Sequence, residues 1–144
     1  MSDTRARLDA VLARGPDPAS AARLGLGLTI LLAGVHKLLA PAPWDALVVP
    51  EFAALLPVSV RVWTLANGVA EIAVALGLLA DRLSAPLAAF VCLSLVGTLC
   101  YLVVVLLAGF DASVTAGTLA ILAVHDVGLA GLAAAVSVRA ARRD

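Results

Sequence analysis

Ionisable residues inside long apolar stretches are the ones in this chain that could do chemistry. His125 and Asp126 are adjacent in AVHDVGLAG at 123–131, and Glu71 lies in ANGVAEIAV at 66–74. A charge at the centre of a membrane-spanning helix costs about 2.5–3.5 kcal/mol, so its presence indicates a function or a pairing. A histidine and a carboxyl group in an apolar medium both titrate near neutral pH. The sequence therefore predicts that Glu71 and His125 relay protons.

Other polar side chains recur at helical spacing in the same stretches, so that each stretch presents one polar line. The four lines are Thr29 with His36; Thr64 with Asn67 and Glu71; Ser94 with Thr98 and Tyr101; and Thr118 with His125. Helices that each present one polar line form a bundle with a polar interior. We expect there a pocket for a quinone or a small substrate. Its further predicted residues are His36, Lys37, Asn67, Thr98, Tyr101 and Asp126.

The predicted depths of these residues differ, counting about 1.5 Å per residue from the outer helix ends. His36 and Lys37 fall near the outer rim of the membrane. Glu71, His125 and Asp126 fall near its midplane. Because successive residues on a helix are turned by about 100°, Asp126 points away from His125. We expect His125 to face the interior and Asp126 to brace an adjacent helix or another subunit.

A purely structural interpretation stands beside the functional one. Serine and threonine in spans usually bond a backbone carbonyl or join helices, and Glu71 could simply pair with His125 or Lys37. Glycines most simply allow helices to approach closely. The glycines concerned are Gly25, Gly27, Gly34, Gly68, Gly97, Gly128 and Gly131.

The elements that must position these residues are membrane helices. The chain has 144 residues, 62% hydrophobic and 14% charged, with a mean hydropathy of +1.06, whereas soluble domains are about 25% charged. Crossing about 30 Å of hydrocarbon takes about 20 residues. Four apolar stretches are long enough to cross it, at about 19–39, 62–80, 86–108 and 116–138. We predict an all-α fold, an integral membrane four-helix bundle with antiparallel up-down topology.

The remaining segments are short. Residues 1–18 predict an amphipathic head helix on the cytoplasmic surface, with Leu8, Val11 and Leu12 opposite arginines. Four prolines interrupt residues 40–61, which we expect to form an interfacial or re-entrant loop over the outer mouth of the bundle. Residues 139–144 form a basic cytoplasmic tail.

Basic residues indicate the orientation. Most arginines precede the first span, follow the last or lie in the second loop, and only Lys37 and Arg61 lie opposite. By the positive-inside rule, both termini are expected to be cytoplasmic, in the cell membrane. The first stretch is expected to stay as a span, because about 18 polar residues precede it. A net charge of +0 predicts no nucleic-acid partner.

Cofactor signals are few. Cys92 and Cys100 stand eight residues apart, about 12 Å along a helix, beyond disulfide reach, and we interpret them as apolar fillers. No C-x-x-C, flavin, iron–sulfur or dinucleotide motif occurs, which disfavours a thiol oxidoreductase, and no metal site or covalently bound cofactor is expected. Haem b between His36 and His125 is disfavoured because their depths differ by roughly 10 Å.

Two segments resemble DoxX-like membrane proteins. The first span, ARLGLGLTILLAGVHKLLAPAPW, resembles the family's opening helix, which is rich in arginine and glycine and ends in a G-x-x-K-L segment, a proline and an aromatic residue. The matching residues are Arg23, Gly25, Gly34, Lys37, Leu38, Pro41 and Trp44. In the second span, Glu71 and Gly77 match the next family segment.

This resemblance implies a four-helix membrane protein, in some members a small subunit accompanying thiosulfate:quinone oxidoreductase activity and in others a partner in a membrane oxidoreductase complex. The leading hypothesis is therefore a small quinone-linked oxidoreductase subunit, with lipid and other membrane subunits or further copies as partners. The alternative is a non-catalytic accessory subunit. Transport of a small solute stays open and would require oligomers, since the chain is too short for inverted repeats.

Overall fold

Four long helices and two short ones make up the described part of the chain. The computed structural model describes residues 17–109 and 115–143. The helices are α2 (Pro18–Leu39), α3 (Ala42–Asp45), α4 (Pro50–Ala53), α5 (Val60–Leu79), α6 (Ser84–Ala108) and α7 (Ala116–Ala141). These ranges contain no strand, which confirms the all-α class. The predicted head helix lies outside the described residues, apart from Asp17 and Pro18, and α7 continues into the predicted basic tail.

Three of the long helices begin where the sequence supplies a capping side chain. The Asp17 carboxylate accepts the Ser20 backbone N–H at 3.1 Å, just before Pro18. The hydroxyl oxygens of Ser59 and Thr115 accept the N–H groups three residues on, at 3.3 and 3.2 Å. Such side-chain acceptors satisfy backbone donors that have no partner within the helix. Helix α6 ends at Gly109, whose φ of 66° favours glycine.

All four long helices are long and apolar enough to cross a membrane. The spans run over Pro18–Leu39, Val60–Leu79, Ser84–Ala108 and Gly117–Ala141. Large apolar side chains point away from the rest of the chain on every one, as Leu32, Leu93 and Ile121 do at 61%, 71% and 72% exposure. Apolar surface of this extent is stable against hydrocarbon and not against water. Length and composition thus indicate a multi-pass membrane protein.

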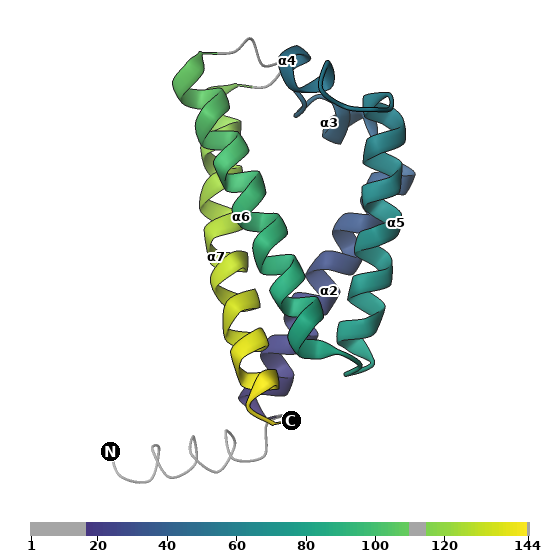
Figure 1. The fold of residues 1–144 in the computed structure, drawn as a ribbon, viewed down its shortest axis with the longest axis vertical. Helices are drawn as coiled ribbons and strands as arrows, with labels where there is room; N and C mark the ends of the chain where they lie inside the picture. Colours follow the sequence, from purple (N-terminus) through teal and green to yellow (C-terminus); the bar gives the residue numbers. More distant parts are fainter. Residues whose placement is uncertain (1–16, 110–114, 144) are drawn as a thin grey trace, which may run out of the picture.

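The long helices are arranged in two pairs (Figure 1). Helix α2 lies against α5, and α6 lies against α7; the pairs meet near one end and diverge toward the end that carries α3 and α4. Where the pairs meet, one apolar cluster joins all four helices. It comprises Leu26, Ile30, Ala75, Leu78, Ala88, Val91, Ala133 and Val136. A second cluster joins Val49 of the α3–α4 segment to α6 and α7, so this segment reaches from one pair to the other.

The contact between α2 and α5 depends on two glycines. A Cβ added at Gly34 would lie 2.7 Å from the Gly68 carbonyl oxygen, and one at Gly68 would lie 3.0 Å from the Gly34 carbonyl oxygen. The absence of side chains lets the two backbones touch, as expected for these glycines. Gly97 and Gly128, by contrast, have no atom within 4 Å of an added Cβ.

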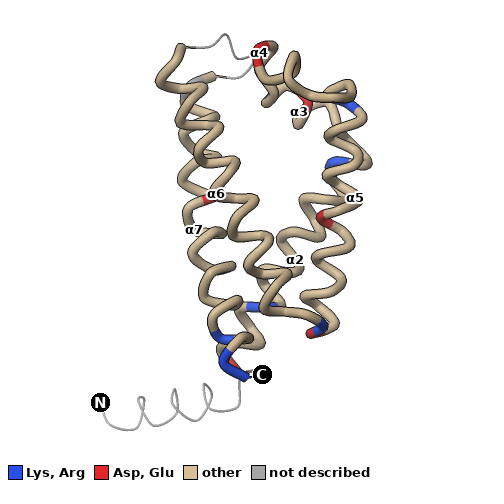
Figure 2. Tube along the Cα trace, viewed as in Figure 1, with Lys and Arg blue, Asp and Glu red and all other residues tan. Residues whose placement is uncertain are grey.

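Charged residues gather where α2 begins and α7 ends (Figure 2). We call this the basic end; its arginines are Arg23, Arg82, Arg139, Arg142 and Arg143. Arg23 joins α2 to the α5–α6 turn, because its Nη1 donates to the carbonyls of Leu78 and Leu79 and its Nε lies 3.1 Å from an Asp81 oxygen. Asp81 itself has a left-handed φ of 55°, a region in which aspartate is found more often than most residues.

We predict that Gly34→Ala destabilises the protein by about 1–3 kcal/mol, because the new methyl group overlaps the Gly68 carbonyl and must separate the helices. Gly97→Ala is the matched control, since it adds a methyl group where there is open space and improves helix propensity by roughly 0.5–1 kcal/mol. Unfolding of both variants in detergent measures this difference. Equal stability of the two variants would refute the close contact.

Candidate functional site

A buried ion pair joins α2 to α5 in the middle of the molecule. The Lys37 ammonium donates a short hydrogen bond to Oε1 of Glu71. Lys37 is 8% exposed, and the Glu71 side chain is 24% exposed. Of the two partners that the sequence leaves open for Glu71, the structure selects Lys37. The pair neutralises two charges that would each be costly within a membrane.

The two residues meet because α2 and α5 do not end at the same level. A Cβ added at Gly68 would lie 3.0 Å from the Lys37 Cβ, so Lys37 is level with Gly68, one turn from Glu71. From Gly68, α5 continues back to Val60, about 12 Å farther along the helix, whereas α2 ends two residues after Lys37. Lys37 therefore lies deeper than its predicted position at the rim.

Trp44 of α3 covers the ion pair and binds His36. The Lys37 ammonium lies 4.3 Å from the centre of the Trp44 ring, a favourable cation–π contact. The indole Nε1 donates to Nδ1 of His36 at 2.8 Å. Since an indole N–H only donates, this Nδ1 carries no proton. His36 is thus beside the ion pair but exposed, and it does not line the cavity described next.

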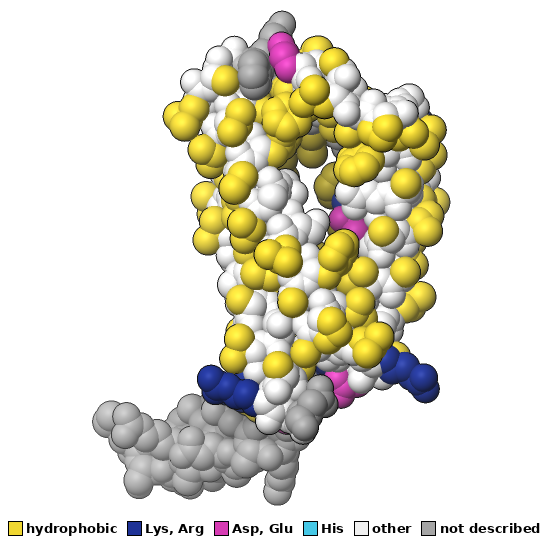
Figure 3. All heavy atoms as spheres, viewed as in Figure 1, with side chains coloured by type: hydrophobic (Ala, Val, Ile, Leu, Met, Phe, Trp, Pro, Cys, Tyr) yellow, Lys and Arg dark blue, Asp and Glu magenta, His cyan; other side chains and the backbone are white. Residues whose placement is uncertain are grey.

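A cavity of about 390 Å³ lies between α5 and α6, with Ile30 of α2 on its wall. It is lined by Ile30, Trp63, Ala66, Asn67, Ala70, Glu71, Val74, Phe90, Val91, Ser94 and Leu95. Trp63 and Phe90 are 45% and 56% exposed, so the cavity opens to whatever surrounds the helices. The space-filling view shows a hollow between the two helix pairs with an acidic side chain at its edge (Figure 3). An apolar cavity with a few polar groups is typical of small-molecule sites.

Of the described residues that line this cavity, Glu71 alone is ionisable. Its Oε1 is engaged by Lys37, whereas its Oε2 is buried without a hydrogen-bond partner in the described part of the chain. A buried carboxylate oxygen without a donor is costly and is satisfied by a ligand that supplies one. With the Asn67 amide and the Ser94 hydroxyl, the cavity offers both donors and acceptors.

His125 does not face the interior as predicted, and Asp126 is the more buried of the two side chains. The Asp126 side chain is 15% exposed and that of His125 is 61% exposed. Asp126 lies on the packed face of α7, at helical spacing from the buried residues Leu119, Ala130 and Ala133. Nδ1 of His125 lies 3.4 Å from an oxygen of the Asp126 carboxylate.

Tyr101 and Thr98 do not line the cavity either. The Tyr101 hydroxyl donates to the Leu47 carbonyl at 2.6 Å and accepts the Val49 N–H at 3.0 Å, while its ring meets Phe52 edge-on. Tyr101 thereby fastens the segment between α3 and α4 to α6. The Thr98 hydroxyl donates to a carbonyl of its own helix, the structural role usual for threonine in spans.

The α3 helix is attached to the start of α5 by a second ion pair. Nε of Arg61 lies 2.6 Å from Oδ2 of Asp45. Partial burial raises the pKa of Asp45, but hydrogen bonds from Thr64 and Arg61 and the charge of Arg61 outweigh this and lower the pKa below its ordinary value. The carboxylate stays ionised at neutral pH, which keeps α3, and with it Trp44, above Lys37.

The aromatic walls of the cavity, Trp63 and Phe90, were not among the predicted site residues. Trp63 precedes Asn67 by four residues, and Phe90 precedes Ser94 by four, so each lies on the helix face of a polar line. Extending the polar lines to apolar neighbours at helical spacing would have found both. Among the described residues, no three His, Cys, Asp or Glu side chains form a metal-ion cluster, and Cys92 and Cys100 are both free.

Comparison of the chain with protein-family models, with curated proteins and with solved structures yields no match to any of them. The resemblance of its first two spans to DoxX-like proteins therefore stays a prediction.

We predict that Tyr101→Phe releases the segment around Val49. The Val49 N–H would be left buried without an acceptor, at a cost of about 1–3 kcal/mol. Hydrogen exchange at the Val49 amide should accelerate on the order of tenfold, while amides near Ala133 keep their protection. Unchanged exchange at Val49 would show that the hydroxyl does not hold this segment.

Proposed function

We propose that this chain is a small integral membrane subunit of a quinone-linked oxidoreductase and that it binds the quinone head group in the cavity between α5 and α6. The observation that carries the proposal is the second oxygen of Glu71, which is buried beside an apolar cavity and has no donor among the residues that the structure describes. The quinone-linked redox role is supported by the resemblance to DoxX-like proteins.

The cavity suits a planar, lipid-soluble ligand. Trp63 and Phe90 offer aromatic faces where the cavity opens, and a ring between them gains stacking and apolar contact. Asn67 donates to a carbonyl oxygen such as that of a quinone, and Glu71 accepts from a hydroxyl such as that of a quinol. A ligand entering from the hydrocarbon needs no aqueous path to reach these groups.

Glu71 is the residue we propose to handle protons. Reduction of a quinone to a quinol consumes two electrons and two protons, and a carboxyl group at the cavity wall exchanges protons with the ligand oxygen. The electrons would come from a redox partner subunit. Asp126, whose side chain is 15% exposed, is the other acidic residue within the four long helices, and we propose it as the second group of a proton path.

The arrangement in the membrane is also a proposal. The chain forms an antiparallel up-down bundle in the cell membrane, with its basic end in the cytoplasm and residues 40–59 at the outer face. The concentration of arginines at the basic end supports this orientation (Figure 2). In this arrangement Trp44 lies on the outer side of the ion pair, between it and the aqueous phase.

A second candidate function is a non-catalytic accessory subunit. Gly97 on α6 and Gly128 and Gly131 on α7 have no atom within 4 Å of an added Cβ. Small residues that no helix of this chain covers allow close approach of a helix from another subunit.

Binding of a short-chain quinone to the protein in nanodiscs tests the cavity. Glu71→Gln should weaken binding by about tenfold or more, the value of a hydrogen bond to a charged group. Glu51→Gln is its matched control, since Glu51 is an exposed carboxylate in α4. Ala70→Phe should abolish binding by filling the cavity, whereas Ala73→Phe, exposed on α5 and away from the lining, should leave binding unchanged.

Equal binding by wild type, Glu71→Gln and Ala70→Phe would contradict the quinone site. If a membrane partner also co-purified and kept full activity with the Glu71→Gln chain, the accessory role would replace the catalytic one.

A further inference from the structure

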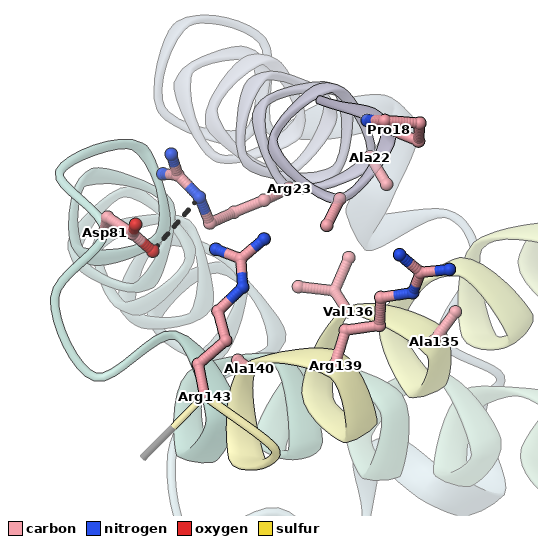
Figure 4. Close-up of a pocket in the computed structure, with 10 residues that line it drawn as sticks. Pro18, Ala22, Arg23, Asp81, Ala135, Val136, Arg139, Ala140 and Arg143 are labelled. Atoms are coloured by element: carbon pink, nitrogen blue, oxygen red, sulfur yellow. Dashed lines mark ion pairs between the residues drawn. The ribbon is translucent and has the colours of Figure 1, made fainter. Parts of the chain in front are cut away.

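A second cavity, of about 220 Å³, lies at the basic end between the first turns of α2 and the last turns of α7 (Figure 4). It is lined by Pro18, Ala19, Ala22, Arg23, Asp81, Ala135, Val136, Arg139, Ala140 and Arg143. A single water needs only roughly 10–15 Å³, so the cavity has room for a much larger group. It is far from the Lys37–Glu71 pair and plays no part in the proposed quinone site.

The cavity carries more positive than negative charge. Three of its lining residues are arginines, and one, Asp81, is acidic. Asp81 pairs with Arg23, and Asp17, just outside the lining, pairs with Arg143 at 3.1 Å. Arg139 has no ion-pair partner in the described part of the chain. Among the described residues, one positive charge of the cavity lining is therefore left without a counterion.

The arginines also keep donors free for an anion. The Arg23 side chain is 13% exposed, and its Nε is buried without a hydrogen bond, although it lies 3.1 Å from the Asp81 oxygen. Figure 4 shows the Arg143 guanidinium pointing toward that of Arg23. Guanidinium groups that face each other bring their N–H donors to one place, where an anion accepts from both.

We propose that this cavity binds the phosphate of an anionic phospholipid. Guanidinium groups recognise phosphate oxygens through paired hydrogen bonds, and basic pockets between membrane helices on the cytoplasmic side are suited to lipid head groups. Apolar side chains, among them Ala22, Ala135 and Val136, form the rest of the wall. They offer contact to the glycerol and the first acyl carbons of a lipid, which a free phosphate ion lacks.

The proposed site distinguishes between lipid classes. A phosphatidylglycerol brings a net negative charge to Arg139, whereas a phosphatidylcholine carries a positive group that the arginines repel. The site therefore selects anionic over zwitterionic lipids although both carry a phosphate. Bound there, the lipid joins α2 to α7, two helices far apart in the sequence.

Native mass spectrometry of the full-length protein, titrated with phosphatidylglycerol in detergent, tests the proposal. Arg139→Gln removes the unpaired cation of the cavity. Arg142→Gln is the matched control, because Arg142 lies in the same turn region, is exposed and does not line the cavity. Arg139→Gln should weaken phosphatidylglycerol binding on the order of tenfold more than Arg142→Gln, because the control loses only nonspecific attraction to the anionic head group. Phosphatidylcholine and inorganic phosphate, titrated in the same way, should bind far more weakly.

Equal losses in the two variants would overturn the proposal by showing a general surface-charge effect. Binding of inorganic phosphate as tight as that of phosphatidylglycerol would overturn the lipid as ligand and leave a free-anion site. Because Arg139 is exposed and has no hydrogen bond or ion pair to other described side chains, the folded variant reports on the site. Circular dichroism of both variants checks this.

Discussion

The ion pair between Lys37 and Glu71 is the constraint on which the rest of the structure depends. Two charges inside a membrane-spanning bundle are tolerated only if they meet each other and are shielded. Gly34 and Gly68 bring α2 and α5 close enough for the pair to form. The ring of Trp44 covers the ammonium, and the α3 ion pair to Arg61 keeps that ring in place.

The same pair explains why an apolar cavity in this chain carries a carboxyl group on its wall. Lys37 occupies one oxygen of Glu71 and leaves the other directed at no donor of the described chain. The two helix pairs diverge at this level, which leaves space between α5 and α6. Tyr101 of α6 binds the segment between α3 and α4, which reaches from one pair to the other. At the opposite end, Arg23 ties α2 to the end of α5 and to Asp81 just after it, and the apolar cluster around Leu26 joins the two helix pairs.

Composition and periodicity were enough to predict the four spans, because lipid imposes their length and apolarity directly. They were not enough to choose the partner of Glu71. Counting depth from the helix ends assumes that the ends of neighbouring helices are level. Helix α2 ends before it reaches the level at which α5 starts, so Lys37 lies within one helical turn of Glu71. Likewise, a 100° projection relates Asp126 to His125 but does not say which of them faces the bundle; packing of α7 decides that. Trp63 was missed because only polar residues were followed along the helix faces.

The most direct measurement compares Lys37→Met, Glu71→Leu and the double variant in two assays, unfolding in detergent and binding of a short-chain quinone. Each single change leaves one buried charge unpaired and should cost about 3–5 kcal/mol of unfolding free energy, whereas the double apolar variant should regain most of it. The double variant should still fail to bind the quinone, because the carboxylate is gone. Additive losses of stability, or quinone binding retained by the double variant, would contradict the account.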